Sequence, residues 1–160
     1  MSSGKRGFTI VELLIVIVVI GILAALVVVA FNGLQGRAKY NKINAELVSM
    51  RNMIELYKAE NGTYPPTAGT FRYQRIDGNN FIPGIVPTYA GQLPRVTDTP
   101  FGSNTNDTYI YTSNAAATGY VVQRLYQTPV PAAEWAFVPD SLKQSGYSDR
   151  YGYGANLSGY

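Results

Sequence analysis

The sequence contains no cysteine and no histidine. The absence of cysteine excludes disulfide bonds and thiol nucleophiles, and the absence of both excludes the common zinc sites. The most frequent general base of enzymes is missing as well. A folded domain of this chain must therefore be stabilised by core packing. An enzyme would need a constellation of carboxylates or serines, and none stands out.

Charge is also scarce. Only 14% of the 160 residues are charged, and the formal net charge is +3. Without Lys5 and Arg6, which lie near the start, 11 basic residues remain against 10 acidic ones. A nucleic-acid site needs clustered lysine and arginine. No nucleic-acid-binding site is therefore expected.

Proline is absent before Pro65, although the chain has nine prolines. This proline-free part contains an apolar run over residues 8–31, in which Glu12 is the only charged residue. As a helix the run would be about 36 Å long, and the hydrocarbon core of a bilayer is about 30 Å thick. The run therefore predicts a membrane-spanning helix.

The features that precede the run differ from those of a secretory signal peptide. Such a peptide has its small-residue cleavage site after the apolar stretch, whereas Gly7 lies before it, behind the basic segment MSSGKR. Cleavage after Gly7 would remove residues 1–7 as a leader and keep the helix. An uncleaved signal anchor is the alternative.

Residues 34–60 show helical periodicity. Apolar side chains recur at alternating steps of three and four, which is typical of one stripe of an amphipathic helix. They are Tyr40, Ile43, Leu47, Met50, Ile54 and Tyr57. One helix over residues 8–60 would join the apolar span, residues 8–31, to an amphipathic half, residues 32–60. Glycine is about 1 kcal/mol less favourable than alanine in a helix, so bending or local melting is expected at Gly21, Gly33 and Gly36.

Residues 61–160 are predicted to form a globular β domain. Residues 109–112 and 120–126 are rich in aromatic and β-branched side chains, which predicts an antiparallel hairpin. Residues 135–138 predict a third strand. Residues 71–100 are too interrupted by glycine and proline for a long strand, and the tail from Ser145 has no clear period. The expected fold class is α+β, with the long N-terminal helix packed on a small antiparallel β-sheet.

The segment KRGFTIVELLIVIVVIGILAALVVVAF resembles the start of type IV pilin-like precursors, the class III signal-peptide superfamily of type IV pilins and type II secretion pseudopilins. Gly7 matches the small residue before the cleavage site, and Phe8 matches the first mature residue, which the family N-methylates. Glu12 matches the fifth-position glutamate, and Gly21 a helix-breaking glycine. The resemblance is strongest over residues 6–63.

The chain departs from many members of this family at two points. Val29 stands where many pilins have a proline that helps to melt the helix in the filament, and the C-terminal cysteine pair is missing. Both departures agree with pseudopilins or with pilins of other bacterial lineages.

Glu12 has two interpretations. Thr9 and Glu12 have the spacing of a capping box, in which the carboxylate closes the start of the helix. The resemblance implies a second role, in which Glu12 pairs with the free amine of Phe8 on a neighbouring subunit during assembly. The resemblance favours assembly over capping alone.

Two features of the β domain invite binding hypotheses. An oxygen-rich loop contains Asp98, Asn104, Asn106 and Asp107. Such groups suit calcium, but they are also ordinary turn residues, and no cofactor is expected. The tail carries Tyr147, Tyr151, Tyr153 and Tyr160. Packing of these tyrosines on their own domain or a neighbour is favoured over a binding surface.

The function implied by the resemblance is structural. The precursor is expected to cross the cytoplasmic membrane once, with its N-terminus in the cytoplasm, and to polymerise with itself into an extracellular type IV pilus filament after prepilin peptidase has cleaved it. A membrane assembly platform and a cytoplasmic ATPase are the other implied partners. The alternative is a pseudopilin of a type II secretion or competence system. A membrane-anchored enzyme or surface domain has less support.

Overall fold

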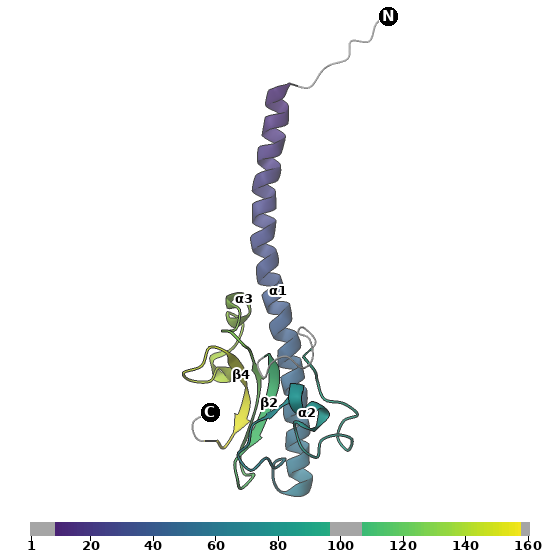
Figure 1. Ribbon diagram of the computed structural model, residues 1–160. Coiled ribbons are helices and arrows are strands. Elements are labelled where there is room, and N and C mark those ends of the chain that lie inside the picture. The colour runs from purple at the N-terminus through teal and green to yellow at the C-terminus, as the bar shows by residue number, and fades with distance from the viewer. Residues whose placement is uncertain (1–8, 97–106, 158–160) are drawn as a thin grey trace, which may run out of the picture.

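The computed structural model describes residues 9–96 and 107–157, apart from the side chains of Val29 and Asn32. One long helix, α1 (Ile10–Asn61), projects from a small domain that contains a four-stranded antiparallel sheet. Figure 1 shows that the C-terminal half of α1 lies against the sheet while its N-terminal half stands free. The predicted α+β class is confirmed.

Both ends of α1 are closed by local hydrogen bonds. Thr9 is the N-cap, and its hydroxyl oxygen accepts from the backbone N–H of Glu12. At the other end Gly62 adopts a left-handed conformation with a φ of 78°, and its N–H donates to the carbonyl of Lys58 over 2.8 Å. This left-handed conformation suits glycine, which lacks the Cβ that disfavours it. The predicted helix, residues 8–60, agrees closely with the observed one.

The glycines of α1 do not interrupt it in this structure. The helix continues through Gly21, Gly33 and Gly36 for all 52 of its residues. The local melting expected there is therefore absent from the single chain, because the i to i−4 hydrogen bonds on either side are retained. Melting within a filament stays a prediction.

The predicted apolar stripe forms the helical side of the core. Ile43, Leu47, Met50 and Ile54 are all buried, and the flanking Tyr40 and Tyr57 are half-buried. They pack against a sheet face that is rich in tyrosine, which includes Tyr109, Tyr111, Tyr120 and Tyr151. Because this face is large and aromatic, the domain buries a core without disulfide bonds.

Carboxylates on α1 satisfy the hydroxyl groups of these buried rings. The Tyr109 hydroxyl donates to Glu46, and the Tyr120 hydroxyl donates to Glu55 over 3.1 Å. A buried hydroxyl without a partner would be costly. The polar positions beside the apolar stripe thus hold the helix in register with the sheet.

The sheet has the order β1-β2-β3-β4. Its central hairpin, β2 (Thr108–Ser113) and β3 (Tyr120–Leu125), confirms the predicted one and pairs Tyr111 with Val122. The edge strands are β1 (Arg72–Tyr73) and β4 (Arg150–Ala155). Neither was predicted. Short helical turns connect the strands: α2 (Gln74–Asp77), η1 (Gly78–Asn80) and η2 (Asp140–Leu142).

The third strand predicted at residues 135–138 is wrong. This segment continues the short helix α3 (Ala132–Trp135) into a turn, in which the N–H of Phe137 donates to the carbonyl of Glu134 over 3.0 Å. Pro131 precedes the helix, a position that suits proline, and alanine and glutamate favour helix. Residues 135–138 are apolar because the turn inserts Val138 into the core.

The tail provides the strand that the sequence did not reveal. In β4, Tyr151 and Tyr153 alternate with Gly152 and Gly154, and β4 pairs with β3 along its length. A Cβ at Gly152 would lie 2.2 Å from the carbonyl oxygen of Val122. Glycine generally weakens a strand. The close pairing of β4 with β3 explains why glycine occurs at this position.

Candidate functional site

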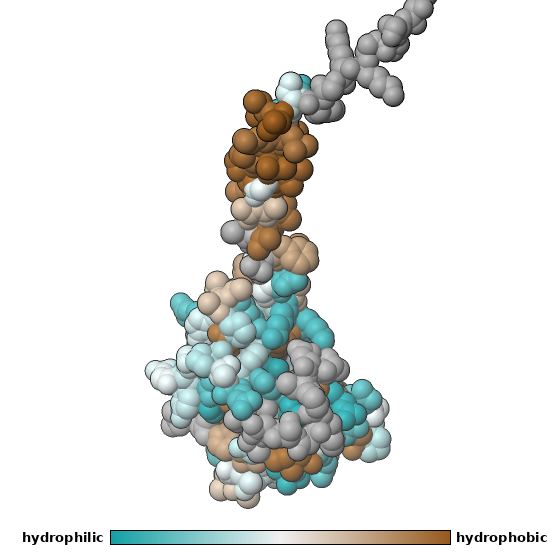
Figure 2. Space-filling view, turned by 45° about the horizontal axis from the view of Figure 1, so that its top comes forward, coloured by the Kyte–Doolittle hydropathy of each residue, from teal (hydrophilic) through white to brown (hydrophobic). Residues whose placement is uncertain are grey.

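The N-terminal part of α1 is an apolar rod, which we define as residues 10–34. The large apolar side chains described in it are exposed, from Val19 at 48% to Ile10 at 84%, and Leu34 is the last of them at 64%. Figure 2 shows the rod as an apolar column that projects from a mostly polar domain. By length and composition it could cross a membrane. An exposed apolar surface of this size marks contact with a membrane or another protein.

Glu12 lies at the free end of the apolar rod and completes a capping box with Thr9. The Glu12 carboxylate accepts from the Thr9 backbone N–H over 2.9 Å and from the Thr9 hydroxyl over 2.8 Å. The capping interpretation is therefore confirmed for the single chain. The capped carboxylate faces outward, where a neighbouring molecule can reach it, and its role in assembly stays a prediction.

The predicted cleavage residues, Gly7 and Phe8, lie outside the described residues. The predicted hinge glycines differ in their surroundings. Gly21 and Gly33 have open space where a Cβ would stand, whereas a Cβ at Gly36 would lie 2.2 Å from the carbonyl oxygen of Ala133. The structure thus gives Gly36 a packing role, because α3 approaches α1 closely there.

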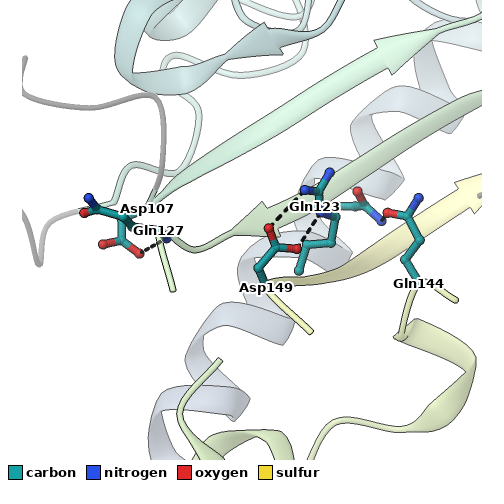
Figure 3. A network of polar contacts seen from close by, with 6 residues as sticks. Asp107, Gln123, Gln127, Gln144 and Asp149 are labelled. Atoms are coloured by element: carbon teal, nitrogen blue, oxygen red, sulfur yellow. Dashed lines mark hydrogen bonds and ion pairs between the residues drawn. The ribbon is translucent and has the colours of Figure 1, made fainter. Parts of the chain in front are cut away.

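Most of the suggested calcium ligands cannot be placed. Asp98, Asn104 and Asn106 lie outside the described residues. Asp107 has a φ of 58°, and its carboxylate accepts from the backbone N–H of Gln127 over 3.3 Å, as Figure 3 shows. Within residues 9–96 and 107–157 no three acidic side chains group as metal ligands would. Calcium binding stays untested.

The tail tyrosines pack mainly on their own domain. Tyr151 is fully buried, and the hydroxyl of Tyr153 donates to Asn44 of α1 over 2.9 Å. Tyr147 is 48% exposed, and the guanidinium of Arg150 lies over its ring. Tyr160 lies outside the described residues. The preferred interpretation, packing over binding, is confirmed for Tyr151 and Tyr153.

A buried polar cluster below the apolar rod was not predicted. Glu134 of α3 is 1% exposed and accepts from the hydroxyls of Tyr126 and Tyr151, the second over 2.7 Å. Its other carboxylate oxygen lies 3.5 Å from the ammonium of Lys39 on α1. Burial, with a smaller contribution from the neighbouring Glu134, raises the pKa of both tyrosines. No local pattern marks this cluster, because its members come from four separate segments.

The comparisons with known proteins agree with this geometry. A model described as the prokaryotic N-terminal methylation motif matches residues 2–28, which include the start of the apolar rod. Type II secretion system core protein G of Escherichia coli is 41% identical over 108 residues, which cover 64% of this chain and 71% of that relative. The chain belongs to the type IV pilin-like family of type II secretion system core protein G.

Other relatives of this pilin-like chain carry the same name. Core protein G of Klebsiella pneumoniae is 40% identical over 105 residues, 62% of this chain and 71% of the relative. That of Dickeya chrysanthemi is 37% identical over 67 residues, which cover 42% and 44% of the two chains. No solved structure matches the chain significantly.

Proposed function

We propose that this chain is a pseudopilin, a structural subunit that polymerises with itself in a type II secretion system. The exposed apolar rod with Glu12 at its end carries the proposal. A subunit of this shape cannot bury the rod within itself, so the rod must contact lipid or other subunits. The relatives named type II secretion system core protein G favour a pseudopilin over a subunit of a long surface pilus.

A polymer explains the rod better than a simple membrane anchor does. A carboxylate inside a bilayer costs about 2.5 to 3.5 kcal/mol on insertion scales, and a solitary anchor gains nothing from it. In a bundle of identical helices the Glu12 carboxylate can pair with the amine of a neighbouring Phe8. When the rod leaves the bilayer for the bundle, it exchanges lipid contacts for protein contacts of similar strength. Stable polymerisation therefore needs many helix contacts together with this charge pair.

Processing follows from the same proposal. Prepilin peptidase removes residues 1–7 by cleaving after Gly7, and Phe8 is then N-methylated, in agreement with the match to the N-terminal methylation motif. The subunit is stored in the inner membrane through the apolar rod. An assembly platform and a cytoplasmic ATPase extract it into the growing fibre. The role is structural rather than catalytic.

The test is a Glu12→Gln substitution in a strain that assembles the fibre. We expect the variant to be cleaved and inserted in the membrane but not to polymerise, because the charge pair is lost while the size of the side chain is kept. The control is Asp140→Asn, which removes an exposed carboxylate that contacts only Lys143 among the described residues. Fibres of normal length and number from Glu12→Gln would contradict the proposal.

Two further measurements separate the alternatives. Mass analysis of the N-terminus in assembled material should show a chain that begins at methylated Phe8, and a chain that begins at Met1 would identify an uncleaved anchor. Electron microscopy of native cells separates the two kinds of fibre. Long surface filaments made mainly of this chain would favour the pilus, whereas short fibres and stability that depends on calcium would favour the pseudopilin.

A further inference from the structure

A small basic recess lies where α1 enters the domain. Four cationic side chains line it, Lys39 and Lys42 from α1, Arg95 from the segment after η1, and Arg124 from β3, together with the single carboxylate Glu46. The space that a water-sized group can occupy is about 20 Å³. This is space for one or two water molecules, so the recess itself admits only one or two oxygen atoms of an anion such as a phosphate, whose remainder would stay at the mouth.

Arg124 is the buried cationic residue that lines this recess. It is 3% exposed, and its guanidinium lies 5.7 Å from the ring centre of Tyr109 and 4.6 Å from that of Tyr126. Its Nε and Nη1 atoms have no hydrogen-bond partner among the described residues. The nearby Glu46 carboxylate already accepts from the Tyr109 hydroxyl. These two atoms are also closed off from solvent, so Arg124 contributes a permanent positive charge to the lining of the recess rather than free donors.

The height of the recess along α1 indicates where the anion comes from. Leu34 is the last exposed large apolar side chain of the apolar rod, and Lys39 follows five residues later, about 7.5 Å along the helix. The headgroup layer on each side of the hydrocarbon core is about 5 to 7 Å thick. With the rod in a bilayer, the recess lies at the level of the lipid phosphates.

We infer that this recess binds a phosphate group, supplied by the headgroup of an anionic phospholipid. Arg124 supplies a fixed positive charge behind the phosphate, and the exposed Lys42 and Arg95 supply further charge and N–H donors at the mouth. An occupied recess holds the domain against the membrane surface before assembly. Extraction into a fibre then requires release of the lipid. The lipid source rests on the proposed storage in the membrane, whereas the phosphate site itself does not.

The first test is native mass spectrometry of the full chain, released from detergent with phosphatidylglycerol or phosphatidylcholine. We expect the wild type to retain phosphatidylglycerol preferentially, and Lys42→Gln and Arg95→Gln each to reduce its retention about tenfold, the effect of one lost charged contact. Both residues are exposed, so neither substitution buries a new polar group or opens a cavity in the core. Arg37→Gln is the matched control, because Arg37 is an exposed cation of α1 that does not line the recess.

The second test uses inorganic phosphate and does not depend on the membrane. Phosphate should raise the midpoint of thermal unfolding above its value in chloride at equal ionic strength, and Lys42→Gln should lose most of that shift while Arg37→Gln keeps it. The comparison with the variants separates binding from the general stabilising effect of phosphate on proteins.

The outcomes of the two tests are distinct. A phosphate shift that depends on Lys42, without any preference for phosphatidylglycerol, supports the phosphate site and overturns its assignment to an anionic lipid. Equal losses in Lys42→Gln and Arg37→Gln would show a general effect of positive charge and overturn the inference. An unchanged response in Lys42→Gln and Arg95→Gln would also overturn it. Neither outcome bears on polymerisation through Glu12.

Discussion

At the scale of residues, Gly36 shows how a single missing side chain positions the domain on the helix. Its buried backbone lets α3 approach α1 so closely that a Cβ would lie 2.2 Å from the Ala133 carbonyl oxygen. The neighbouring Gly33 has open space at the same position. Two glycines three residues apart on one helix therefore have different reasons to be there, and substitution separates them.

Gly36→Ala should destabilise the full chain by about 1 to 3 kcal/mol, because the added methyl group overpacks the contact between α1 and α3. Gly33→Ala should leave stability unchanged or raise it by up to about 1 kcal/mol, because alanine favours helix. Thermal unfolding in detergent, followed by near-ultraviolet circular dichroism, measures both. Equal midpoints for the two variants would contradict the packing role of Gly36.

The buried tyrosines form a second set of residues with a shared property. Desolvation raises the pKa of each above its ordinary value of about 10, and for four of the five a carboxylate neighbour raises it further. The five are Tyr109, Tyr111, Tyr120, Tyr126 and Tyr151. They stay protonated in the folded chain at pH values where the same residues ionise in the unfolded chain.

These tyrosines should therefore contribute their full share to the free energy of unfolding below pH 10. Above pH 10 the free energy of unfolding should fall steeply. Each tyrosine that is protonated only in the folded state lowers the free energy of unfolding by about 1.4 kcal/mol per pH unit. Exposed tyrosines such as Tyr147 ionise gradually, whereas the tyrosinate absorbance of the five buried ones should appear together with the loss of far-ultraviolet circular dichroism, in one sharp transition above pH 10. Ionisation of these five tyrosines well before the loss of secondary structure would contradict their burial.

At the scale of elements, α1 is one helix with two environments. Its amphipathic half is positioned by the sheet, through the apolar stripe and the carboxylates that accept from tyrosine hydroxyls. The apolar rod has no such contacts within the described chain and depends on its backbone hydrogen bonds and the cap at Thr9. Any change of α1 on assembly is therefore expected in the rod or at its junction with the domain.

Hydrogen exchange can locate that change. In the detergent-bound subunit we expect protected amides throughout residues 13–61, including those around Gly21 and Gly33, because the helix is continuous there. In assembled fibres we expect faster exchange between Gly21 and Gly36, where glycine weakens the helix. Fast exchange of this stretch in the single subunit would contradict the continuous helix, and full protection in fibres would contradict melting.

At the scale of the whole molecule, the apolar rod and the domain have surfaces suited to different environments, the rod to lipid or other helices and the domain to water. The domain buries its own core, whereas the large apolar side chains described in the rod are exposed. Figure 2 shows one face of the molecule, on which the rod is apolar and the domain mostly polar. The backbone of α1 joins the two parts, and the contacts around Gly36 and Lys39 lie beyond the rod, within the domain. Solubility and folding should therefore be separable by removing the rod.

A chain that begins at Leu34 should be a folded, soluble monomer without detergent. It keeps the Gly36 contact, the Lys39 and Glu134 ion pair and the entire apolar stripe. Light scattering measures its mass, and near-ultraviolet circular dichroism reports its tyrosine packing. Aggregation of the shortened chain, or loss of its near-ultraviolet signal, would show that the domain depends on the rod.

The sequence by itself determined the features that depend on local pattern. The apolar run, the stripe from Tyr40 to Tyr57, the cap at Thr9 and the central hairpin all follow from periodicity and propensity, which act over a few neighbouring residues. The placement of Gly7, Phe8 and Glu12 relative to the run was enough for the resemblance to the pilin-like family, since that motif is also local.

Only the tertiary structure decided the features that join distant segments. Glycine-rich β4 is a strand because β3 offers it hydrogen bonds and close packing, and residues 135–138 turn inward because the core has room for Val138. The Glu134 cluster and the basic recess around Arg124 each gather side chains from helix and sheet. Such contacts depend on the folded path of the chain, which periodicity within one segment does not encode.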